Sequence, residues 1–390
     1  MSVVASEDLR RQNTALVLRA LRRHGPTTRT ELARLTGLAK ATVGTIVASL
    51  EESAHVAEGD LAQGSRGRPG RPVALSGHRM VGLGLEVNVD YVAAVALDLG
   101  GRSHLLETRV VDDADPFDVL VGLASSASAQ LQADGLEIVG TTVAIPGLVD
   151  RAEGMVALAP NLGWTSRPLA HEVSDALGRA VAVENDANCA ALAEATRGVA
   201  VGARLSVYLT GTVGIGAGIV EDGTIVRGTS GFAGEVGHTP IGDPDAECGC
   251  GRHGCWEASV GMRAMLAAVG MEEVGTPIET AELVAQRATE NAGVRDGLAG
   301  VGAILGRGIA TVTNILNPDT LVLGGYFVPL APALMPAVRR AIDELVPARA
   351  FHDVDVRLST LGLRAAATGA AEEALSPMFD GAAFAGAPDA

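Results

Sequence analysis

The sequence predicts an α/β protein that consists of a basic helix-turn-helix head followed by a larger, acidic α/β body. Three observations predict it: a helix-turn-helix pattern within the first fifty residues, a change in the sign of the charge near residue 80, and apolar β-like runs that alternate with helical stretches further along. The 390 residues are too many for one compact core, so two or three domains are expected. A hydrophobic fraction of 47% is typical of a globular chain and excludes wholesale disorder.

Charge is divided unequally along the chain. Residues 1–80 carry twelve basic and seven acidic side chains, a net charge of +5, whereas the remainder has a net charge of −21. A basic head on an acidic body is typical of a polyanion-binding module attached to a part that repels polyanions, although uneven surface charge without function is the alternative. With 3% aromatic residues, the chain is not expected to offer broad base-stacking surfaces to single-stranded nucleic acid.

The sequence also bears on location. No apolar run approaches the roughly eighteen residues that cross a bilayer, and the first twelve residues lack the apolar core of a signal peptide. We therefore expect a cytoplasmic protein with no membrane partner.

The head carries the pattern of three short helices. Residues 13–24 have leucines at near-helical spacing and end at a Gly-Pro pair that stops a helix. Thr28 and Glu31 have the spacing of a capping box, in which each side chain satisfies the other's backbone donor. A turn at Gly37 then precedes a third apolar-periodic helix through residues 43–50. Helix, glycine-containing turn and helix is the arrangement that places a recognition helix in the DNA major groove.

The third helix is the predicted recognition helix, with Lys40, Thr42 and Thr45 on its outward face near its start. Ala39 stands at its N-cap, where a Ser or Asp would stabilise the helix by roughly 1 kcal/mol. Gly44 costs about as much relative to alanine inside the helix. This glycine either permits close approach to DNA or is simply tolerated.

A basic, Gly- and Pro-rich stretch follows the three helices at residues 63–72. Arg66, Arg68 and Arg71 have no core to join there, and Arg-Gly-Arg-Pro is similar to short arms that enter narrow minor grooves. The alternative is a basic interdomain linker, but next to three helices a DNA-binding wing is favoured. One winged helix-turn-helix makes few contacts, so we expect a homodimer that reads two half-sites of a double-stranded DNA operator.

Three of the four cysteines fall within eight residues and predict a metal site. His238, Cys248, Cys250 and Cys255 offer one imidazole and three thiolates from a Gly-rich loop. That ligand set suits tetrahedral zinc and leaves no open position, so the role of the metal should be structural. His253 is a competing ligand, and free cysteines in a loop are the alternative reading.

Polar residues also stand beside glycines elsewhere in the body, several of them after apolar β-like runs. They are Asn161, Asn185, Asp186, Glu235 and Glu257. Loops of an α/β body that follow strands in this way define a site, although each of these residues taken alone is more often solvated than functional.

Two motifs carry a resemblance to a known family. Residues 234–238, Gly-Glu-Val-Gly-His, precede the cysteine cluster that runs to Trp256 and Glu257, and residues 184–188 read Glu-Asn-Asp-Ala-Asn. Over nearly its whole length the chain resembles the ROK family of repressors, open reading frames and sugar kinases, in its transcriptional-regulator branch. The resemblance implies a two-lobed, actin-like, sugar-kinase (ribonuclease H-like) body with a structural zinc loop.

The resemblance also implies domain bounds and a binding site between the lobes. We expect a winged helix-turn-helix at 1–78, a smaller lobe at 79–195 completed by a C-terminal helix near 365–378, and a larger lobe at 196–364. The implied sugar contacts are Asn161, Asn185, Asp186, Glu235, His238 and Glu257. Carboxylates and amides pair bidentately with vicinal hydroxyls, and His238 would use one ring nitrogen for zinc and the other for the sugar.

The nucleotide side departs from the kinases of the family. Where they carry Asp-x-Gly-Gly-Thr, this chain has residues 86–90, Glu-Val-Asn-Val-Asp, without the glycines and with an added carboxylate. Val213 stands where the kinases have a hydroxyl, and Tyr326 replaces a glycine of the adenosine loop. Three departures on one side predict no catalysis, with Asp186 left at the position of the kinase base and ATP not expected as a ligand.

These observations favour a sugar-responsive transcriptional regulator, most plausibly a repressor of carbohydrate genes. An active ATP-dependent sugar kinase with an appended head and a zinc-responsive regulator are the alternatives. We expect a homodimer or a dimer of dimers that uses residues 300–317, a predicted helix with small residues on one face.

Overall fold

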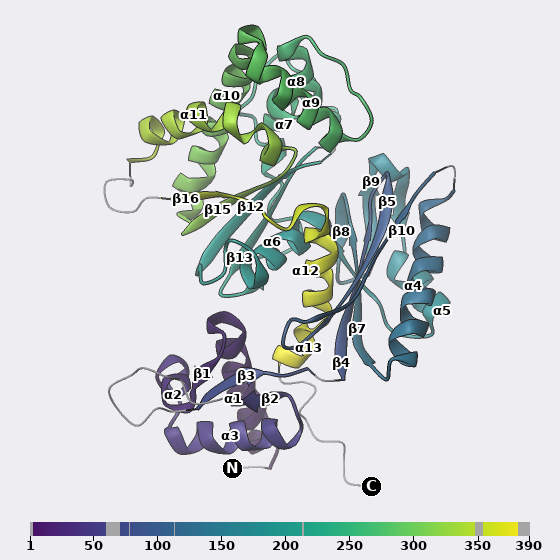
Figure 1. Ribbon diagram of the computed structural model, residues 1–390, viewed down its shortest axis with the longest axis vertical. Helices are drawn as coiled ribbons and strands as arrows, with labels where there is room; N and C mark the ends of the chain where they lie inside the picture. Colours follow the sequence, from purple (N-terminus) through teal and green to yellow (C-terminus); the bar gives the residue numbers. More distant parts are fainter. Residues whose placement is uncertain are drawn as a thin grey trace. The chain divides into compact units, whose positions relative to one another are not determined.

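The computed structural model describes residues 3–59, 71–77, 79–112, 114–212, 214–347 and 354–380, with side chains from residue 8 onward. The chain forms two compact units (Figure 1). Unit 1 comprises Met1–Glu184 and Ala367–Ala390, and unit 2 comprises Asn185–Ala366.

The head at the start of unit 1 is a winged helix-turn-helix. Its elements are α1 (Val3–His24), β1 (Thr27–Thr28), α2 (Arg29–Thr36), α3 (Lys40–Glu52), β2 (Val56–Glu58) and β3 (Pro72–Leu75). The strands form an antiparallel sheet in the order β1-β3-β2. Apolar side chains of all three helices bury one another, among them Leu18 and Leu21 of α1, Leu32 of α2, and Val43 and Val47 of α3. The first helix begins ten residues before the predicted start, because its first turns expose apolar residues such as Leu9 and so lack the periodic pattern of burial.

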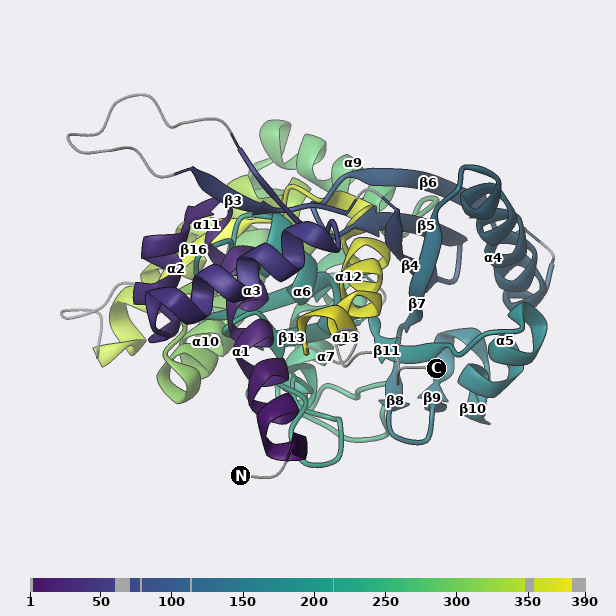
Figure 2. The same cartoon turned by 90° about the horizontal axis from the view of Figure 1, so that it is seen from below.

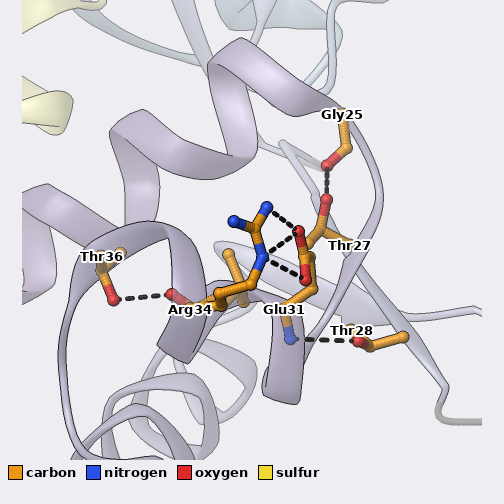
Figure 3. A network of polar contacts seen from close by, with 7 residues as sticks. Gly25, Thr27, Thr28, Glu31, Arg34 and Thr36 are labelled. Atoms are coloured by element: carbon orange, nitrogen blue, oxygen red, sulfur yellow. Dashed lines mark hydrogen bonds and ion pairs between the residues drawn. The ribbon is translucent and has the colours of Figure 1, made fainter.

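The start of α2 forms half of the predicted capping box (Figure 3). The Thr28 hydroxyl accepts a hydrogen bond from the Glu31 backbone N–H at 3.3 Å. The Glu31 carboxylate turns the other way and accepts from Nε of Arg34 at 2.9 Å, because an arginine three residues on lies on the same helix face. Prediction of the reciprocal bond was therefore wrong, while the prediction of the helix start is confirmed. Ala39 makes no side-chain cap to α3, as expected.

The rest of unit 1 is a five-stranded sheet in the order β11-β7-β4-β5-β6. Its strands are β4 (Met80–Val87), β5 (Tyr91–Asp98), β6 (Ser103–Val110), β7 (Glu137–Ile145) and β11 (Ala182–Asn185). The β4-β5-β6 pairs are antiparallel and β4 pairs parallel with β7. A small antiparallel sheet of β8 (Leu148–Asp150), β9 (Met155–Ala159) and β10 (Trp164–Arg167) adjoins it in sequence.

Helices cover both faces of this sheet (Figure 1). On one face, α4 (Pro116–Ala133) and α5 (Leu169–Leu177) pack against Leu83 and Leu85 of β4. On the other face lies α12 (Ala365–Ala374), which is followed by α13 (Ser376–Phe379). Side chains of β4 alternate between the faces, so the glycines at 82 and 84 face α12, and a Cβ at either would overlap the backbone of that helix. The backbone of α12 therefore lies directly on the sheet.

Unit 2 repeats the same sheet pattern. It begins with α6 (Asp186–Arg197) and has a sheet in the order β14-β13-β12-β15-β16. The strands are β12 (Leu205–Gly211), β13 (Ile215–Glu221), β14 (Thr224–Ile225), β15 (Thr320–Gly325) and β16 (Asp355–Leu358). The first three pair antiparallel, and β12, β15 and β16 pair parallel.

The remaining helices of unit 2 pack around the long helix α10 (Figure 1). They are α7 (Trp256–Val260), α8 (Met262–Val269), α9 (Pro277–Glu290), α10 (Ala292–Leu316) and α11 (Phe327–Leu345). By length and composition α10 is the one helix of the described chain that could cross a membrane, but it packs against α7, α8, α9 and α11 and buries Leu298, Leu305 and Ile309. It therefore serves as a core helix here.

The small residues of α10 are used within the chain. Gly302 lies against Leu334 and Gly306 against Val338, both on α11, and a Cβ at Gly308 would overlap the ring of Trp256. The face of small residues in the predicted dimer surface is thus in part an intramolecular helix contact.

Candidate functional site

The predicted metal ligands come together in unit 2. His238 ends the 3₁₀ turn η2 (Val236–His238), and the three thiols belong to the loop that leads into α7. The candidate ligand atoms of His238, Cys248, Cys250 and Cys255 all lie within 4.8 Å of one another. Nδ1 of His238 is 3.7 Å from Sγ of Cys248, and Sγ of Cys250 is 3.7 Å from Sγ of Cys255. A zinc–sulfur bond of about 2.3 Å gives a tetrahedral edge of about 3.8 Å, so the cluster has the size that a tetrahedral zinc ion requires.

Backbone hydrogen bonds, instead of a hydrophobic core, hold the cysteine loop. The Cys248 N–H donates to the Arg252 carbonyl at 2.8 Å, and the Gly251 N–H donates to the Cys248 carbonyl at 2.9 Å. Gly251 and Gly254 adopt φ of 81° and 75°, the left-handed region that favours glycine. Burial raises the pKa of the Cys248 thiol to about 12 and also raises the pKa of Cys255. A bound cation would have to displace these protons to make the thiolates that ligate metal.

The competing ligand His253 lies outside the cluster. Its Nε2 atom is 3.7 Å from the Glu247 carboxylate, and both side chains are exposed. Of the two histidines near the cysteines, His238 is therefore the one placed to complete a four-ligand site.

Carboxylates gather beside the metal cluster in unit 2. Asn185 caps α6 through its side-chain oxygen, which accepts from the Asn188 N–H at 3.0 Å, and Asp186 is the first residue of that helix. Burial raises the pKa of Asp186 to about 6; backbone N–H groups at the start of α6 oppose this shift and the charge of Glu235 adds to it. Glu235 precedes η2, and burial, together with the charge of Glu257, raises its pKa while His238 lowers it. Asp186, Glu235, His238 and Glu257 thus form one electrostatically connected group.

Two of these side chains are oriented by their neighbours. The Glu257 carboxylate accepts a hydrogen bond from the Ile215 N–H at 2.8 Å, and a Cβ at Gly214 would overlap it. His238 directs Nδ1 toward Cys248 and Nε2 toward Glu235, whose carboxylate lies 3.9 Å away. One edge of the ring is therefore turned to the thiols and the other to the carboxylates.

Asn161 belongs to the other unit. It lies exposed in the 3₁₀ turn η1 (Pro160–Leu162) between β9 and β10, followed by Gly163 with φ of 67°. The structure thus brings four of the predicted sugar contacts together in unit 2, with Asn185 beside them in sequence, and leaves Asn161 on unit 1.

Two residues of the nucleotide-side loops make contacts within the chain. The buried Glu86 carboxylate accepts from the Tyr91 hydroxyl at 2.7 Å and from the Ala367 N–H at 3.1 Å, at the start of α12. Tyr326 has no exposed surface; it packs edge-on to Phe327, and a Cβ at Gly211 would overlap its ring. Burial and the charge of Glu257 raise the pKa of Tyr326. Val213, the third departure from the kinase pattern, lies outside the described residues.

The predicted DNA contacts are spread over two parts of the head. On α3, Lys40 and Thr45 are exposed and Thr42 is half-buried, and a Cβ on Gly44 would contact nothing within 4 Å. The Arg71 guanidinium lies 3.7 Å from the Glu58 carboxylate. Arg66 and Arg68 lie outside the described residues. The described part of the head therefore presents the start of α3 as an open surface.

Comparison with known proteins decides the family. The ROK family profile matches residues 83–376, about three quarters of the chain. The chain belongs to the ROK family. The MarR family profile matches residues 8–67, which cover most of the winged head.

Relatives of two kinds match this ROK chain. The xylose repressor of Bacillus subtilis is 27% identical over 385 residues, which cover 97% of this chain and 99% of the repressor. A glucokinase of Streptomyces coelicolor is 29% identical over 320 residues, which cover 76% of this chain and 99% of the glucokinase. The crystal structure of a ROK family transcriptional regulator, a homologue of the E. coli MLC protein, matches with a TM-score of 0.77 at 26% identity and covers 96% of this chain and 98% of its own.

The comparisons and the structure together confirm the predicted fold class: a winged helix-turn-helix followed by a ROK sugar-kinase body. The repressor and regulator matches extend over head and body alike, whereas the glucokinase match leaves a quarter of the chain uncovered. The sequence motifs had not singled out Glu86 as a partner of α12, since the bond joins residues 281 positions apart.

Proposed function

We propose that this ROK protein is a sugar-responsive transcriptional repressor, whose head binds an operator in double-stranded DNA and whose body binds the sugar. The observation that carries the proposal is that a repressor and a transcriptional regulator match nearly the full length of this chain, head included. The head of this chain presents an open recognition-helix surface. Lys40, Thr42 and Thr45 would contact the major groove, and Arg66, Arg68 and Arg71 the backbone or minor groove.

The sugar would bind to the carboxylate group of unit 2. Asp186, Glu235 and Glu257 offer acceptors, and Nε2 of His238 offers a further hydrogen-bonding atom on the same side. Asn185 and, from unit 1, Asn161 complete the proposed contacts. Acceptors of this kind pair with the vicinal hydroxyls of an aldose, and a ligand that leaves them unpaired is rejected. The xylose repressors among the relatives make xylose the first candidate and glucose the second.

Zinc would be the metal of the Cys₃His cluster and would have a structural role. The four ligands would fill the coordination sphere of a tetrahedral ion, so no position is left for a reacting group. By holding Nδ1 of His238, the ion would fix the orientation of the ring that meets the sugar.

We propose that the body has a sugar-kinase fold without kinase activity. The Glu86 carboxylate, at the first position of the phosphate-loop motif, accepts hydrogen bonds from Tyr91 and α12, and Tyr326 fills space beside Gly211. Since one head makes few DNA contacts, we propose that the active species is a homodimer. It would act in the cytoplasm, where its operator lies.

A sugar kinase with an appended head is the second candidate. It is favoured by the raised pKa of Asp186, because a general base is most effective when its pKa lies near the working pH. The 31% identity to a Halalkalibacterium halodurans glucokinase over 58% of the chain points the same way.

One experiment separates the two candidates. The zinc-loaded protein is titrated onto an operator selected from a random duplex library, with and without each aldose, while ATP consumption is followed with the same aldoses. A repressor shows an operator affinity that depends on one aldose and consumes no ATP. Turnover of ATP with an aldose that leaves operator binding unchanged would establish the kinase instead.

A further inference from the structure

The C-terminal helix α12 touches three functional parts of unit 1. In its first turn the Ala367 N–H donates a hydrogen bond to the Glu86 carboxylate near the end of β4. Near its end stand two consecutive buried acids, Glu372 and Glu373, which are 1% and 7% exposed. Two buried carboxylates in a row are unusual for a helix, and each is held by an arginine from a different region.

The first of these acids binds the DNA-binding head. Nη2 of Arg22, on α1, lies 2.8 Å from the Glu372 carboxylate, and the Arg22 side chain is 13% exposed. The guanidinium also lies 4.4 Å from the centre of the Phe379 ring on α13, and Arg19 pairs with Asp380 at 2.5 Å. The first helix of the head is thus joined to α12 and α13 by charge and by ring contact, and α1 and α13 lie next to each other in the fold (Figure 2).

The second acid, Glu373, is linked through Arg151 to the strand that precedes the proposed sugar contacts. Nη2 of Arg151 lies 2.7 Å from the Glu373 carboxylate, and Nη1 of the same guanidinium lies 3.2 Å from the Glu184 carboxylate. Glu184 is almost fully buried near the end of β11, and the next two residues are Asn185 and Asp186. Arg151 therefore bridges α12 to the residue that directly precedes two proposed sugar contacts.

The packing of α12 makes it suited to transmit a displacement. Successive helix residues point about 100° apart, so Glu372 and Glu373 reach partners on different sides of one rigid helix. Glycines at 82, 84 and 140 leave no side-chain layer between the helix backbone and the sheet. A close-packed contact of this kind passes on a shift instead of absorbing it.

We propose that α12 couples the sugar site to the DNA-binding head through the Glu184–Arg151–Glu373 bridge and the Glu372–Arg22 pair. This inference rests on the proposed function. A sugar that engages Asn185 and Asp186 favours one position of the end of β11; the bridge carries that preference to α12, and the Arg22 pair carries it to α1. Arg151 and Arg22 are positioning residues that contact neither sugar nor DNA.

The test uses Arg151→Met and Arg22→Met in the full-length, zinc-loaded protein. Arg109→Met is the matched control, since Arg109 also binds a glutamate, Glu107, at 2.8 Å in unit 1 but has no bond to α12 among the described contacts. Two quantities are measured: the ratio of operator Kd with and without saturating xylose or glucose, and the amide hydrogen exchange of residues 13–24 in α1. Exchange in α4 serves as the reference for global stability.

The wild type and Arg109→Met are expected to show a Kd ratio of about 10 or more. Both test variants should still bind the sugar, yet their ratio should fall to within about threefold of 1. Without any sugar, Arg151→Met should speed exchange in α1 by about tenfold or more while α4 is unchanged. The α1 effect has no local explanation, because Arg151 bonds to β11 and α12.

Failure of the inference is distinct from failure of the proposed function. If the wild type responds to sugar and Arg151→Met responds as strongly, the inference is overturned and the repressor proposal stands. If no aldose changes operator binding by the wild type, the repressor proposal fails and the sugar part of the inference with it. Unchanged α1 exchange in Arg151→Met overturns the mechanical link in either case.

Discussion

Nδ1 of His238 lies 3.7 Å from Sγ of Cys248, while the opposite edge of the same ring faces the Glu235 carboxylate. One side chain thus joins the metal cluster to the proposed sugar contacts. This geometry predicts that loss of the metal also disturbs the sugar response.

Loss of the metal is the first prediction. The native protein should contain one zinc ion per chain, and Cys250→Ser should lose it, because the variant removes one of four ligands. Zinc loss should lower the melting temperature and abolish aldose binding, as measured by metal analysis, thermal unfolding and calorimetry. Cys189→Ala is the control, since Cys189 lies in α6 away from the cluster and should leave the zinc content unchanged. Full aldose binding by zinc-free Cys250→Ser would contradict the role of His238.

Asp186→Asn is expected to stabilise the fold and abolish the sugar response. Burial raises the pKa of Asp186 from 3.8 to about 6, so the folded protein disfavours the charged carboxylate. Stability is lost as the pH rises from 3.8 through 6, and an asparagine avoids this loss. At pH 7.5 the gain should be about 1–2 kcal/mol in the free energy of unfolding, discounted for partial solvent exposure, and it should shrink as the pH falls below 6.

Denaturant unfolding of the zinc-loaded variant at pH 7.5 and pH 5.5 measures this gain. Asp175→Asn is the control, because Asp175 is 72% exposed and, among the ion pairs of the described residues, pairs only with its neighbour on α5, His171. A destabilised Asp186→Asn at pH 7.5 would show that the carboxylate is favoured in the fold, contrary to its buried setting.

The recognition helix gives a prediction in DNA binding. Lys40→Ala should weaken operator binding about 10-fold and reduce the slope of log Kd against log salt by about one, because one phosphate or base contact is lost. Fluorescence anisotropy over a series of salt concentrations measures both values. Arg204→Ala, a surface arginine of unit 2 that pairs with Glu221, is the matched loss of positive charge. Equal effects of the two variants on operator binding would contradict the proposal that α3 contacts the DNA.

Tyr326 is expected to act through its ring and not through its hydroxyl. The hydroxyl lies near the Met262 backbone but makes no hydrogen bond of good geometry with the described residues, so Tyr326→Phe should change the free energy of unfolding little. Tyr326→Ala should cost about 3–5 kcal/mol, because the ring is fully buried against Phe327 and Gly211. Both values follow from denaturant unfolding, and a strongly destabilised Tyr326→Phe would reveal a partner for the hydroxyl.

The sequence was sufficient where the chemistry is local. The recognition helix followed from apolar spacing over 43–50, and the metal cluster from three cysteines and a histidine whose ligand atoms do meet. Local rules failed at Glu31, where an arginine three residues away competes for the carboxylate that the capping box requires.

Long-range pairs were beyond the reach of sequence spacing. Arg22 meets Glu372 and Arg151 meets Glu373 across more than two hundred residues, and only the folded sheet, with glycines beneath α12, brings them together. The small residues of α10 are ambiguous for the same reason: they are equally suited to contact a second chain or α11, and Gly302 and Gly306 contact α11.

The proposed repressor requires a body that has retained its carbohydrate contacts and uses them to control the head. The most direct test is the operator Kd of the zinc-loaded protein at fixed salt, measured with and without xylose and then with each other aldose. We predict that one aldose changes this Kd by at least about tenfold, equivalent to about 1.4 kcal/mol of coupling, with no ATP required. An operator Kd that no aldose changes, with rapid ATP consumption on one of them, would contradict it.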